Sequence, residues 1–403
     1  MKHILIIEGF RPAHECLKSL GAEITMIIEE YRLSGNEDEL YNRVVSVSTD
    51  AGYQQWIDAA LRVNKISNID AVINFHENRQ LETLKICETL GIPYHNKTAI
   101  LAAKDKIYMR RILNQLELDK IKNIEITSKD QLLEQQKIKP PYIIKPYNGW
   151  ASKNIFFIKD EREIFEIADK IFDNKTYDKY CLEEFIDGEE YSVEAFSEFG
   201  IHKIISVTQK YKNENFVEIG HCLPAKIEID IYNKIVDFII NILDGLGIRN
   251  GATHSEIIVN NIGEVNLVET HLRLGGDNIP ELIRYTTGID ILNLWCRNVM
   301  GEKVLKNIPV LRAHECNKFS SIYYIMSDNN IEGKRVKQIT GIDKVKNSSK
   351  ICEIKMFIGE GETINITNDS FSRLGYVIAI GDTYEEAINN AKQGCSEIKI
   401  CVE

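Results

Sequence analysis

The chain lacks the features that mark secreted, membrane-bound and nucleic-acid-binding proteins. Its nine cysteines include no C-x-x-C pair, and their odd number argues against both a disulfide framework and a cysteine-rich zinc site. No stretch approaches roughly 18 uninterrupted apolar residues, and the run Ile4 to Ile7 is too short for a signal peptide. The formal net charge of −11 has the wrong sign for a main partner that is nucleic acid or an anionic membrane. We therefore expect a cytoplasmic protein without either partner.

A glycine-rich dinucleotide motif is also missing. A Rossmann site needs G-x-G-x-x-G after the first strand, but the sequence there is Glu8-Gly9-Phe10-Arg11-Pro12. This argues against NAD binding, although a related fold without that cofactor fits the pattern.

What the first hundred residues do contain is an alternation of short apolar runs and segments of helical period. They follow one another as 3–8, 11–20, 23–28, 53–64, 70–75 and 77–90. Such a βα repeat predicts a parallel sheet with helices on its faces.

The pattern changes after this region. We expect one helix over 97–117, and then an α+β unit inserted into the larger α/β chain, with strands at 140–146, 154–160, 179–185, 191–198 and 202–209. A further helix is expected over 231–246, followed by a hairpin of strands at 252–259 and 264–270. Short β-like pieces and a helix over 384–394 follow residue 311, and we find no residues suited to chemistry there.

The hairpin carries the strongest chemical signal. A four-residue loop from Asn260 to Gly263 places Glu256 opposite Leu267. The same register places His254 opposite Glu269 on the same face. The two glutamates are then diagonal neighbours about 7 Å apart, close enough to hold one hard cation.

His271 and Arg273 continue this face if the strand stays extended. Two carboxylates, a histidine and an arginine on an otherwise apolar face are hard to explain by packing, because buried charges need partners. The alternative interpretation is a solvated hairpin face that carries an ordinary Glu–Arg ion pair.

Two lysines are placed to bind an anion. Lys145 ends an apolar strand and precedes a loop of small residues with free backbone N–H groups, which suits a phosphate. Lys106, near the start of a helix, offers a second phosphate contact. The alternative for both is a solvated surface lysine.

Acidic residues also bracket the turn at Asp187-Gly188, within CLEEFIDGEEYSVE. Carboxylates beside exposed backbone would suit the amino group of adenine and the hydroxyls of a ribose. Taken alone, such residues equally fit a solvent-facing turn.

The order of these motifs resembles the ATP-grasp superfamily. Lys106 comes first, then Lys145-Pro with its loop, then Leu-Glu-Glu-Phe-Ile-x-Gly-x-Glu over 182–190, and finally Glu256 with Glu269-x-His-x-Arg-x-Gly-Gly. The chain is most similar to carboxylate–amine ligases of the L-amino-acid ligase (dipeptide synthetase) type. It is more distantly similar to glycinamide ribonucleotide synthetase and biotin carboxylase.

The resemblance covers residues 1–310, and the segment 375–391 is similar to the closing domain of these ligases. It implies an ATP-grasp fold of the α/β and α+β multidomain class. The implied parts are an N-terminal parallel α/β (pre-ATP-grasp) domain over 1–95, an ATP-grasp domain over 96–310 with a lid subdomain at about 128–205, and a small β-rich α+β domain over 311–403.

On the nucleotide side, the resemblance implies that Lys106 and Lys145 hold the phosphates of ATP. Ser152 falls in the loop that covers these phosphates. Glu183 and Glu184 match the adenine-side hinge. The loop has only one glycine between Pro146 and Asn154, whereas the family's loop is usually richer in glycine, and we expect this to affect loop closure and turnover rate.

On the catalytic side, Glu190 matches the ribose-binding glutamate, and Glu256 and Glu269 match the magnesium-binding acids. Arg273 matches the arginine that stabilises charge on the acyl phosphate and the tetrahedral intermediate. His271 stands where the family has asparagine and is our third candidate metal ligand. It could favour a metal other than Mg²⁺, such as Mn²⁺, or no metal.

Substrate contacts are expected between the N-terminal and central domains. The candidates are His76, Glu77, His221, Arg273, Gly276 and Asp277. A glutamate at position 77 would suit an α-ammonium group, and it would equally suit the first turn of the next helix.

The implied activity is an ATP-dependent ligase. The γ-phosphoryl of ATP passes to a substrate carboxylate, and an amine then attacks the acyl phosphate to give an amide, ADP and phosphate. The expected substrates are two amino acids. The alternatives are another acceptor, as in glycinamide ribonucleotide synthetase or a carrier-protein ligase, and a non-catalytic ATP-binding module. Ligases of this superfamily are often dimers, so the resemblance also implies a homodimer.

Overall fold

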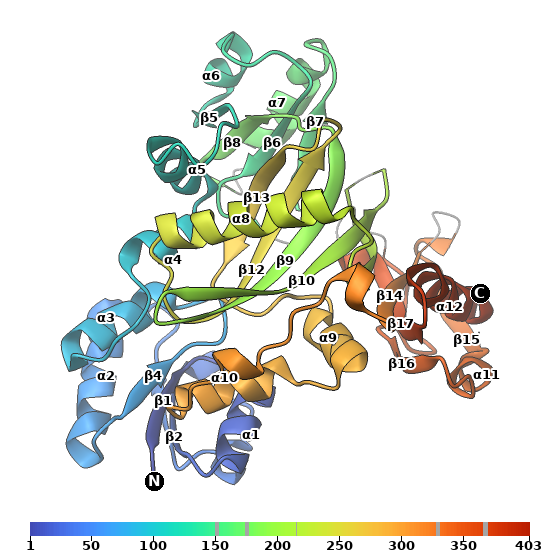
Figure 1. The fold of residues 1–403 in the computed structure, drawn as a ribbon. Coiled ribbons are helices and arrows are strands. Elements are labelled where there is room, and N and C mark those ends of the chain that lie inside the picture. Colours follow the sequence, from blue (N-terminus) through green and yellow to red (C-terminus); the bar gives the residue numbers. More distant parts are fainter. Residues whose placement is uncertain (150–152, 174–176, 215, 328–330, 366–369) are drawn as a thin grey trace.

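The computed structural model describes residues 1–149, 153–173, 177–214, 216–327, 331–365 and 370–403. These residues form two four-stranded sheets, one eight-stranded sheet and a small two-stranded sheet, with helices between them (Figure 1). Ser152, predicted to lie in the phosphate-covering loop, is outside the described residues. No helix among the described residues combines the length and the apolar character that a bilayer span requires.

The N-terminal sheet is parallel, in the order β3-β2-β1-β4, as the βα repeat predicted. Its strands are β1 (His3–Ile7), β2 (Glu23–Glu29), β3 (Arg43–Val47) and β4 (Ala71–Ile73). Its helices are α1 (Arg11–Ser19), α2 (Tyr53–Ile66) and α3 (Gln80–Leu90). Strand β3 was missed by the sequence analysis, although its β-branched residues RVVSV are typical of a strand. Apolar runs buried on both faces explain why these strands pair in parallel.

The second four-stranded sheet is antiparallel, in the order β5-β8-β6-β7. It contains β5 (Asn123–Ile126), β6 (Tyr142–Pro146), β7 (Phe156–Ile158) and β8 (Tyr180–Glu184). Helices α6 (Lys129–Glu134) and α7 (Glu163–Asp173) pack on it through a separate core that includes Leu132, Ile144 and Leu182. This unit ends at Glu184, and the chain then enters the large sheet.

The large sheet is antiparallel, in the order β13-β12-β9-β10-β11-β14-β17-β16. Its strands are β9 (Gly188–Glu198), β10 (Ile201–Lys212), β11 (Glu218–Leu223), β12 (Gly251–Asn260), β13 (Val265–His271), β14 (Phe319–Met326), β16 (Ile351–Met356) and β17 (Arg373–Gly381). The C-terminal strands therefore continue the same sheet that carries the predicted metal hairpin. The expected boundary at residue 311 falls within the connection between two of its strands.

The remaining elements flank this sheet. They are α4 (Lys97–Lys104), α5 (Lys106–Gln115), α8 (Ile229–Gly245), α9 (Ile279–Thr287), α10 (Ile291–Val299), α11 (Ile342–Lys346), α12 (Tyr384–Glu397), β15 (Val336–Thr340) and β18 (Lys399–Val402). Strands β15 and β18 pair with each other.

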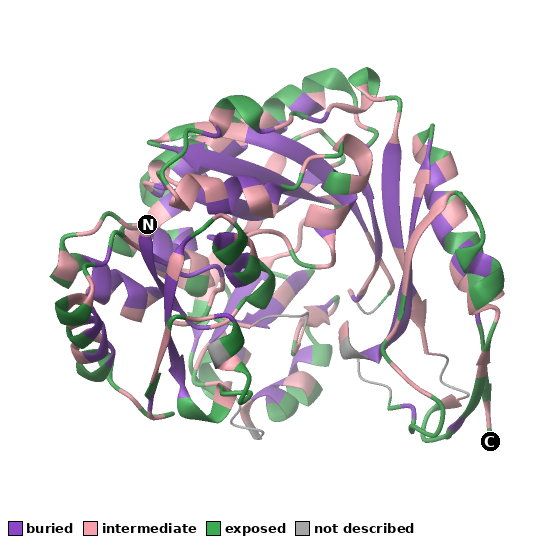
Figure 2. Cartoon of the chain, turned by 90° about the horizontal axis from the view of Figure 1, so that it is seen from below, coloured by how far each residue is buried: buried purple, intermediate pink, exposed green. Residues whose placement is uncertain are grey.

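Two hydrophobic cores lie on opposite faces of the large sheet, and its strands are largely buried in Figure 2. Alternate residues of β9 supply the two cores, because successive side chains of a strand point to opposite faces. Phe196 packs with the N-terminal sheet, α1, α9 and α10. Val193 and Ala195 pack with α4, α5 and α8. The large sheet is thereby joined to the N-terminal sheet by apolar packing.

The predicted single helix over 97–117 is wrong, because the chain forms two helices that meet at Asp105. Asp105 has an extended backbone, and its side chain accepts hydrogen bonds from the backbone N–H groups of Ile107 and Tyr108. This is an N-cap, which satisfies orphan donors at the start of a helix. Lys106 is therefore the first residue of α5.

Candidate functional site

The register of the β12–β13 hairpin differs from the prediction. Val259 pairs with Val265, and Glu256 lies directly opposite Glu269. The pairing shifts between Ile257 and Glu256, which leaves Val268 as an extra residue in β13. This bulge turns Leu267 toward the core with Ile257, so Leu267 does not share the face of the glutamates.

The bulge brings the two predicted metal-binding carboxylates together. Residues directly opposite in an antiparallel pair are about 5 Å apart, closer than the diagonal spacing expected from the sequence. His254 and His271 are likewise opposite, with ring centroids 5.9 Å apart. One face of the hairpin therefore carries two carboxylates and two imidazoles.

Each of these carboxylates contacts a lysine from another element. Lys106 Nζ lies 2.6 Å from Glu269 Oε2, and Lys210 Nζ lies 2.8 Å from Glu256 Oε1. Burial alone would raise the pKa of both acids, but the neighbouring lysine and histidine together outweigh it and hold each pKa well below its usual range. Both side chains are thus carboxylates at neutral pH, the form that a hard divalent cation prefers.

Lys210, on β10, was missed by the sequence analysis. Its buried ammonium contacts Glu190 at 2.9 Å and Glu218 at 2.6 Å, in addition to Glu256. Burial lowers the pKa of Lys210, but the three carboxylates raise it further than burial lowers it. The lysine thus connects the predicted ribose glutamate to the predicted metal glutamate. Nothing in the sequence indicated that Lys210 is buried, because a single lysine in a strand that mixes polar and apolar residues is usually solvated.

Lys145, on β6, lies in a buried network rather than on the surface. Lys145 Nζ is 2.6 Å from Glu183 Oε2, and Arg110 Nε is 2.7 Å from Glu183 Oε1. Arg110 also contacts Asp119 and donates to the carbonyl of the bulged residue Val268, at 3.4 Å. The two cations hold the pKa of Glu183 well below its usual range against the effect of burial.

The neighbouring Glu184 lies apart from this network. Its Oε1 accepts from the backbone N–H of Lys122 at 2.8 Å, next to the connection into β5. Glu183 and Glu184 therefore point to different surroundings, as successive residues of a strand do.

Glu77, after β4, meets the end of β13. It contacts His271 Nδ1, and its Oε1 is 3.5 Å from Arg273 Nε. His271 Nε2 is also 3.2 Å from Glu269 Oε1. Because carboxylates contact both ring nitrogens, they raise the pKa of His271 despite its burial. His76 is close enough for the charges of Glu77 and Arg273 to affect its pKa, which burial lowers.

A second ionic group lies at the start of β17. Arg373 contacts both carboxylate oxygens of Asp277, at 2.8 and 3.0 Å, and Glu218 Oε2 at 3.2 Å. His221 Nε2 is 2.9 Å from Asp277 Oδ2. The guanidinium of Arg373 also lies over the ring of Tyr324, 3.8 Å from its centroid. The C-terminal region, where the sequence showed no chemistry, therefore contributes an arginine to this cluster.

The Gly-Gly pair positions Asp277. A Cβ at Gly275 would lie 2.9 Å from Glu194 Oε2 and 3.0 Å from His254 Nδ1, whereas Gly276 has open space around it. Asp277 itself has φ of 52°, in the left-handed region. The tight turn is needed because the chain must pass the Glu194–His254 pair, in which Nδ1 and Oε1 are 2.7 Å apart.

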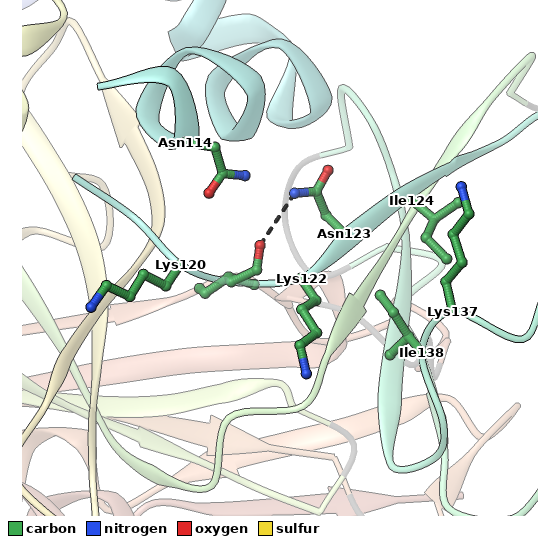
Figure 3. A pocket seen from close by; sticks show the side chains of 8 residues that line it. Asn114, Lys120, Lys122, Asn123, Ile124, Lys137 and Ile138 are labelled. Atoms are coloured by element: carbon green, nitrogen blue, oxygen red, sulfur yellow. Dashed lines mark hydrogen bonds between the residues drawn. The ribbon is translucent and has the colours of Figure 1, made fainter. Parts of the chain in front are cut away.

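A pocket of about 360 Å³ lies elsewhere, between α5, β5 and the segment that contains Lys137 and Ile138. Three lysines line it, but their side chains point in different directions in Figure 3. The predicted site residues do not line this pocket. The charged cluster around the hairpin is the better candidate for chemistry.

Comparisons with known proteins show what the domains of this chain are similar to. A family model described as ATP-grasp domain matches residues 138–281, and one described as L-amino acid ligase C-terminal domain 2 matches residues 333–403. The chain is 26% identical over 268 residues to alanine–anticapsin ligase from Bacillus subtilis, an alignment that covers 61% of this chain. The match covers 57% of that ligase, so the chain spans little more than half of its length.

Solved structures share the fold over the whole chain. The crystal structure of L-amino acid ligase from Bacillus licheniformis matches with a TM-score of 0.83 and 21% identity, covering 100% of this chain and 99% of that one. Phosphoribosylglycinamide synthetase from Anaerococcus prevotii matches with a TM-score of 0.71 and 20% identity, covering 100% of both chains.

Proposed function

The chain has the ATP-grasp fold and carries an L-amino acid ligase C-terminal domain, and from this premise we propose that it is an ATP-dependent carbon–nitrogen ligase. The proposed reaction activates a carboxylate as an acyl phosphate, joins it to an amine and releases ADP and phosphate. The observation that carries the proposal is the pair of opposed carboxylates, Glu256 and Glu269, each balanced by a lysine of a different element.

The residues fit a bound magnesium ion. Glu256 and Glu269 are ionised oxygen donors on one face, and in this structure lysine ammonium groups supply the positive charge beside them. We propose that these two glutamates hold Mg²⁺, which would offset the negative charge of the phosphates. His271 is a weaker candidate than the sequence indicated, because carboxylates contact both of its ring nitrogens.

Lys106 and Lys145 would bind the phosphates of ATP, including the phosphate that is transferred. Lys106 and Lys145 each contact one carboxylate, at 2.6 Å, and could exchange it for a phosphate oxygen when ATP binds. We assign Glu190 to the ribose hydroxyls, with Lys210 fixing its carboxylate. Glu183 is occupied by two cations, so in our proposal it positions Lys145 and does not contact adenine.

Arg273 would stabilise the charge that develops on the acyl phosphate and on the tetrahedral intermediate. Its Nε is 3.5 Å from Glu77, which fixes the arginine at the meeting point of the N-terminal sheet and the hairpin. The carboxyl ends of parallel strands β1 and β4 reach the same place, where α/β sheets usually bind their ligands. We therefore propose that the carboxylate and amine substrates meet there, and that both are amino acids.

The test is phosphate release from ATP and Mg²⁺ with single amino acids and with pairs, together with mass spectrometry of the products. Release that requires two amino acids and yields their dipeptide supports the proposal. Phosphate release with a different carboxylate or amine would support the ligase activity but would change the proposed substrates. ATP binding without release under any combination would contradict the ligase and favour a binding module.

The matched variants are Arg273→Ala and Arg297→Ala. Arg297 lies on the outer part of α10 and pairs with Glu302, away from the charged cluster. We expect loss of product only for Arg273→Ala. Equal loss in both variants would show that the effect is not specific to the site.

A further inference from the structure

Two cysteines meet where the N-terminal domain packs against the rest of the molecule. Cys16 lies on α1 and Cys296 on α10, two helices that contact each other and lie side by side in Figure 1. Cys296 belongs to the core cluster that joins the N-terminal sheet to the large sheet, and the partly buried Cys16 packs against that cluster. They are far apart in the sequence, so the fold alone brings them together.

The contacts of the two sulfur atoms are reciprocal. Cys296 Sγ donates to the carbonyl of Ala13 at 3.6 Å, and Ala13 lies one turn before Cys16 on α1. Asn293 Nδ2 donates to Cys16 Sγ at 3.5 Å, and Asn293 lies one turn before Cys296 on α10. Each sulfur therefore touches the residue one turn before the other cysteine. The two thiols are also close enough for each to shift the pKa of the other.

The two thiols differ in accessibility and acidity. Cys16 is half-buried, whereas Cys296 is fully buried. The neighbouring thiol of Cys296 lowers the pKa of Cys16, and the neighbouring thiol of Cys16 together with burial raises the pKa of Cys296. An accessible thiol of lowered pKa next to a second thiol is the arrangement found in reversible redox pairs.

We propose that Cys16 and Cys296 form a reversible disulfide when the protein meets an oxidant of the peroxide class. The sulfur of Cys16 attacks one oxygen of the peroxide O–O bond and becomes a sulfenic acid. The other oxygen takes the thiol proton and leaves as an alcohol or water. The sulfur of Cys296 then attacks the sulfur of Cys16, and the departing hydroxide takes the Cys296 proton and leaves as water. In total, two thiols are oxidised and one peroxide is reduced. A thiol reductant reduces the disulfide back to two thiols.

The disulfide would fix two segments that lead to the charged cluster. Helix α1 follows the carboxyl end of β1, and Glu8 at that end pairs with Arg32. Helix α10 follows α9, which begins directly after Asp277 and Asn278. A covalent link between α1 and α10 would thus hold the N-terminal domain to the large sheet. This inference does not depend on which reaction the site performs.

The experiment treats the reduced full chain with a small excess of hydrogen peroxide, blocks the remaining thiols with an alkylating reagent and maps the digest by mass spectrometry. We expect an intact mass about 2 Da lower before alkylation, and after alkylation two fewer adducts and one cross-linked peptide pair that contains Cys16 and Cys296. A thiol reductant should remove the link. The oxidised wild-type chain should also melt several degrees higher than the reduced chain, because the link closes a very long loop.

The variants Cys16→Ser and Cys401→Ser are the matched pair, because both cysteines are accessible and only Cys16 has a partner thiol. Cys16→Ser should abolish the cross-link and the melting shift, and Cys401→Ser should change neither. Oxidation of Cys16 to a sulfinic acid without a link would overturn the proposal. A link to any cysteine other than Cys296 would do so as well, and neither result requires a substitution in the buried Cys296.

Discussion

At the scale of single residues, the acids of the candidate site already contact basic side chains before any ligand binds. Lys106 pairs with Glu269, Lys210 is shared by Glu256 and two other carboxylates, and Arg373 is shared by Asp277 and Glu218. Ligand binding must therefore exchange ion pairs, because an uncompensated buried charge is costly. Removal of one partner is expected to affect both the chemistry and the remaining charge.

Glu269→Gln should abolish turnover while the protein stays folded. The amide keeps the size of the side chain but removes the charge that would bind the metal, so we expect phosphate release to fall by roughly 10²-fold or more. Phosphate release and a circular dichroism spectrum measure the two effects. Product formation at the wild-type rate would contradict the assignment of Glu269.

Lys145→Ala should weaken ATP binding by about 10- to 100-fold, since one charge-assisted hydrogen bond to a phosphate is lost. Isothermal titration calorimetry with ATP measures the affinity. The control is Lys122→Ala, because the Lys122 side chain is exposed and its ammonium lies 3.8 Å from Glu184. Unchanged affinity in Lys145→Ala would refute the phosphate role.

His254 should make stability depend on pH. Burial lowers its pKa, but Glu194 and Glu256 outweigh this and raise the pKa to about 10, above the value of 6.5 for the unfolded chain. The charged pair therefore stabilises the fold fully below about pH 6.5, and this stability is lost as the pH rises toward about 10. Urea unfolding between these pH values should show a larger decline for wild type than for His254→Gln. Parallel declines would contradict the raised pKa.

At the scale of elements, local devices position the charged residues, and only some of them could be predicted from the sequence. The alternation of apolar runs identified most strands and helices, including the hairpin that carries Glu256 and Glu269. The register of this hairpin could not be predicted, because the bulge at Val268 depends on tertiary contacts. Leu267 packs in the core, and Arg110 donates a hydrogen bond to the carbonyl of Val268. The break at Asp105 was missed because helical period continues on both sides of it.

Asp105→Ala should test that break. The carboxylate caps α5 and also contacts Lys179 Nζ at 3.0 Å, which links the start of α5 to β8. We expect Asp105→Ala to lower the free energy of unfolding by about 1 kcal/mol through loss of the cap. Asp105→Asn, which retains a capping oxygen, should lose less. An equal loss in the two variants would mean that the ion pair, rather than the cap, is the main contribution.

At the scale of the whole molecule, the charged cluster draws residues from every part of the chain. Glu77 comes from the N-terminal sheet, Lys145 from the second sheet, Glu256 from the central hairpin and Arg373 from a late strand. The ordered motifs indicated the residues within single segments. Lys210 and Arg373 could not be predicted, because their partners are set by strand order and not by sequence spacing.

Arg373→Met should destabilise the protein as a whole. It leaves Asp277 and Glu218 without the guanidinium that pairs with both, and the loss of one member of a buried pair costs about 3–5 kcal/mol. Arg373→Lys keeps the charge without the two-pronged geometry and should lose less. Urea denaturation measures both variants. Equal stability of Arg373→Met and wild type would contradict the structural role of this arginine.

The order of strands in the large sheet also bears on how the protein is made. On the ribosome, β9 to β13 are synthesised long before β14 and β17, yet β11 pairs with β14. Until those strands emerge, β11 presents an unpaired hydrogen-bonding edge, which is the kind of edge that promotes aggregation. Nascent chains of intermediate length would therefore expose this edge, whereas the finished sheet pairs β11 on both sides.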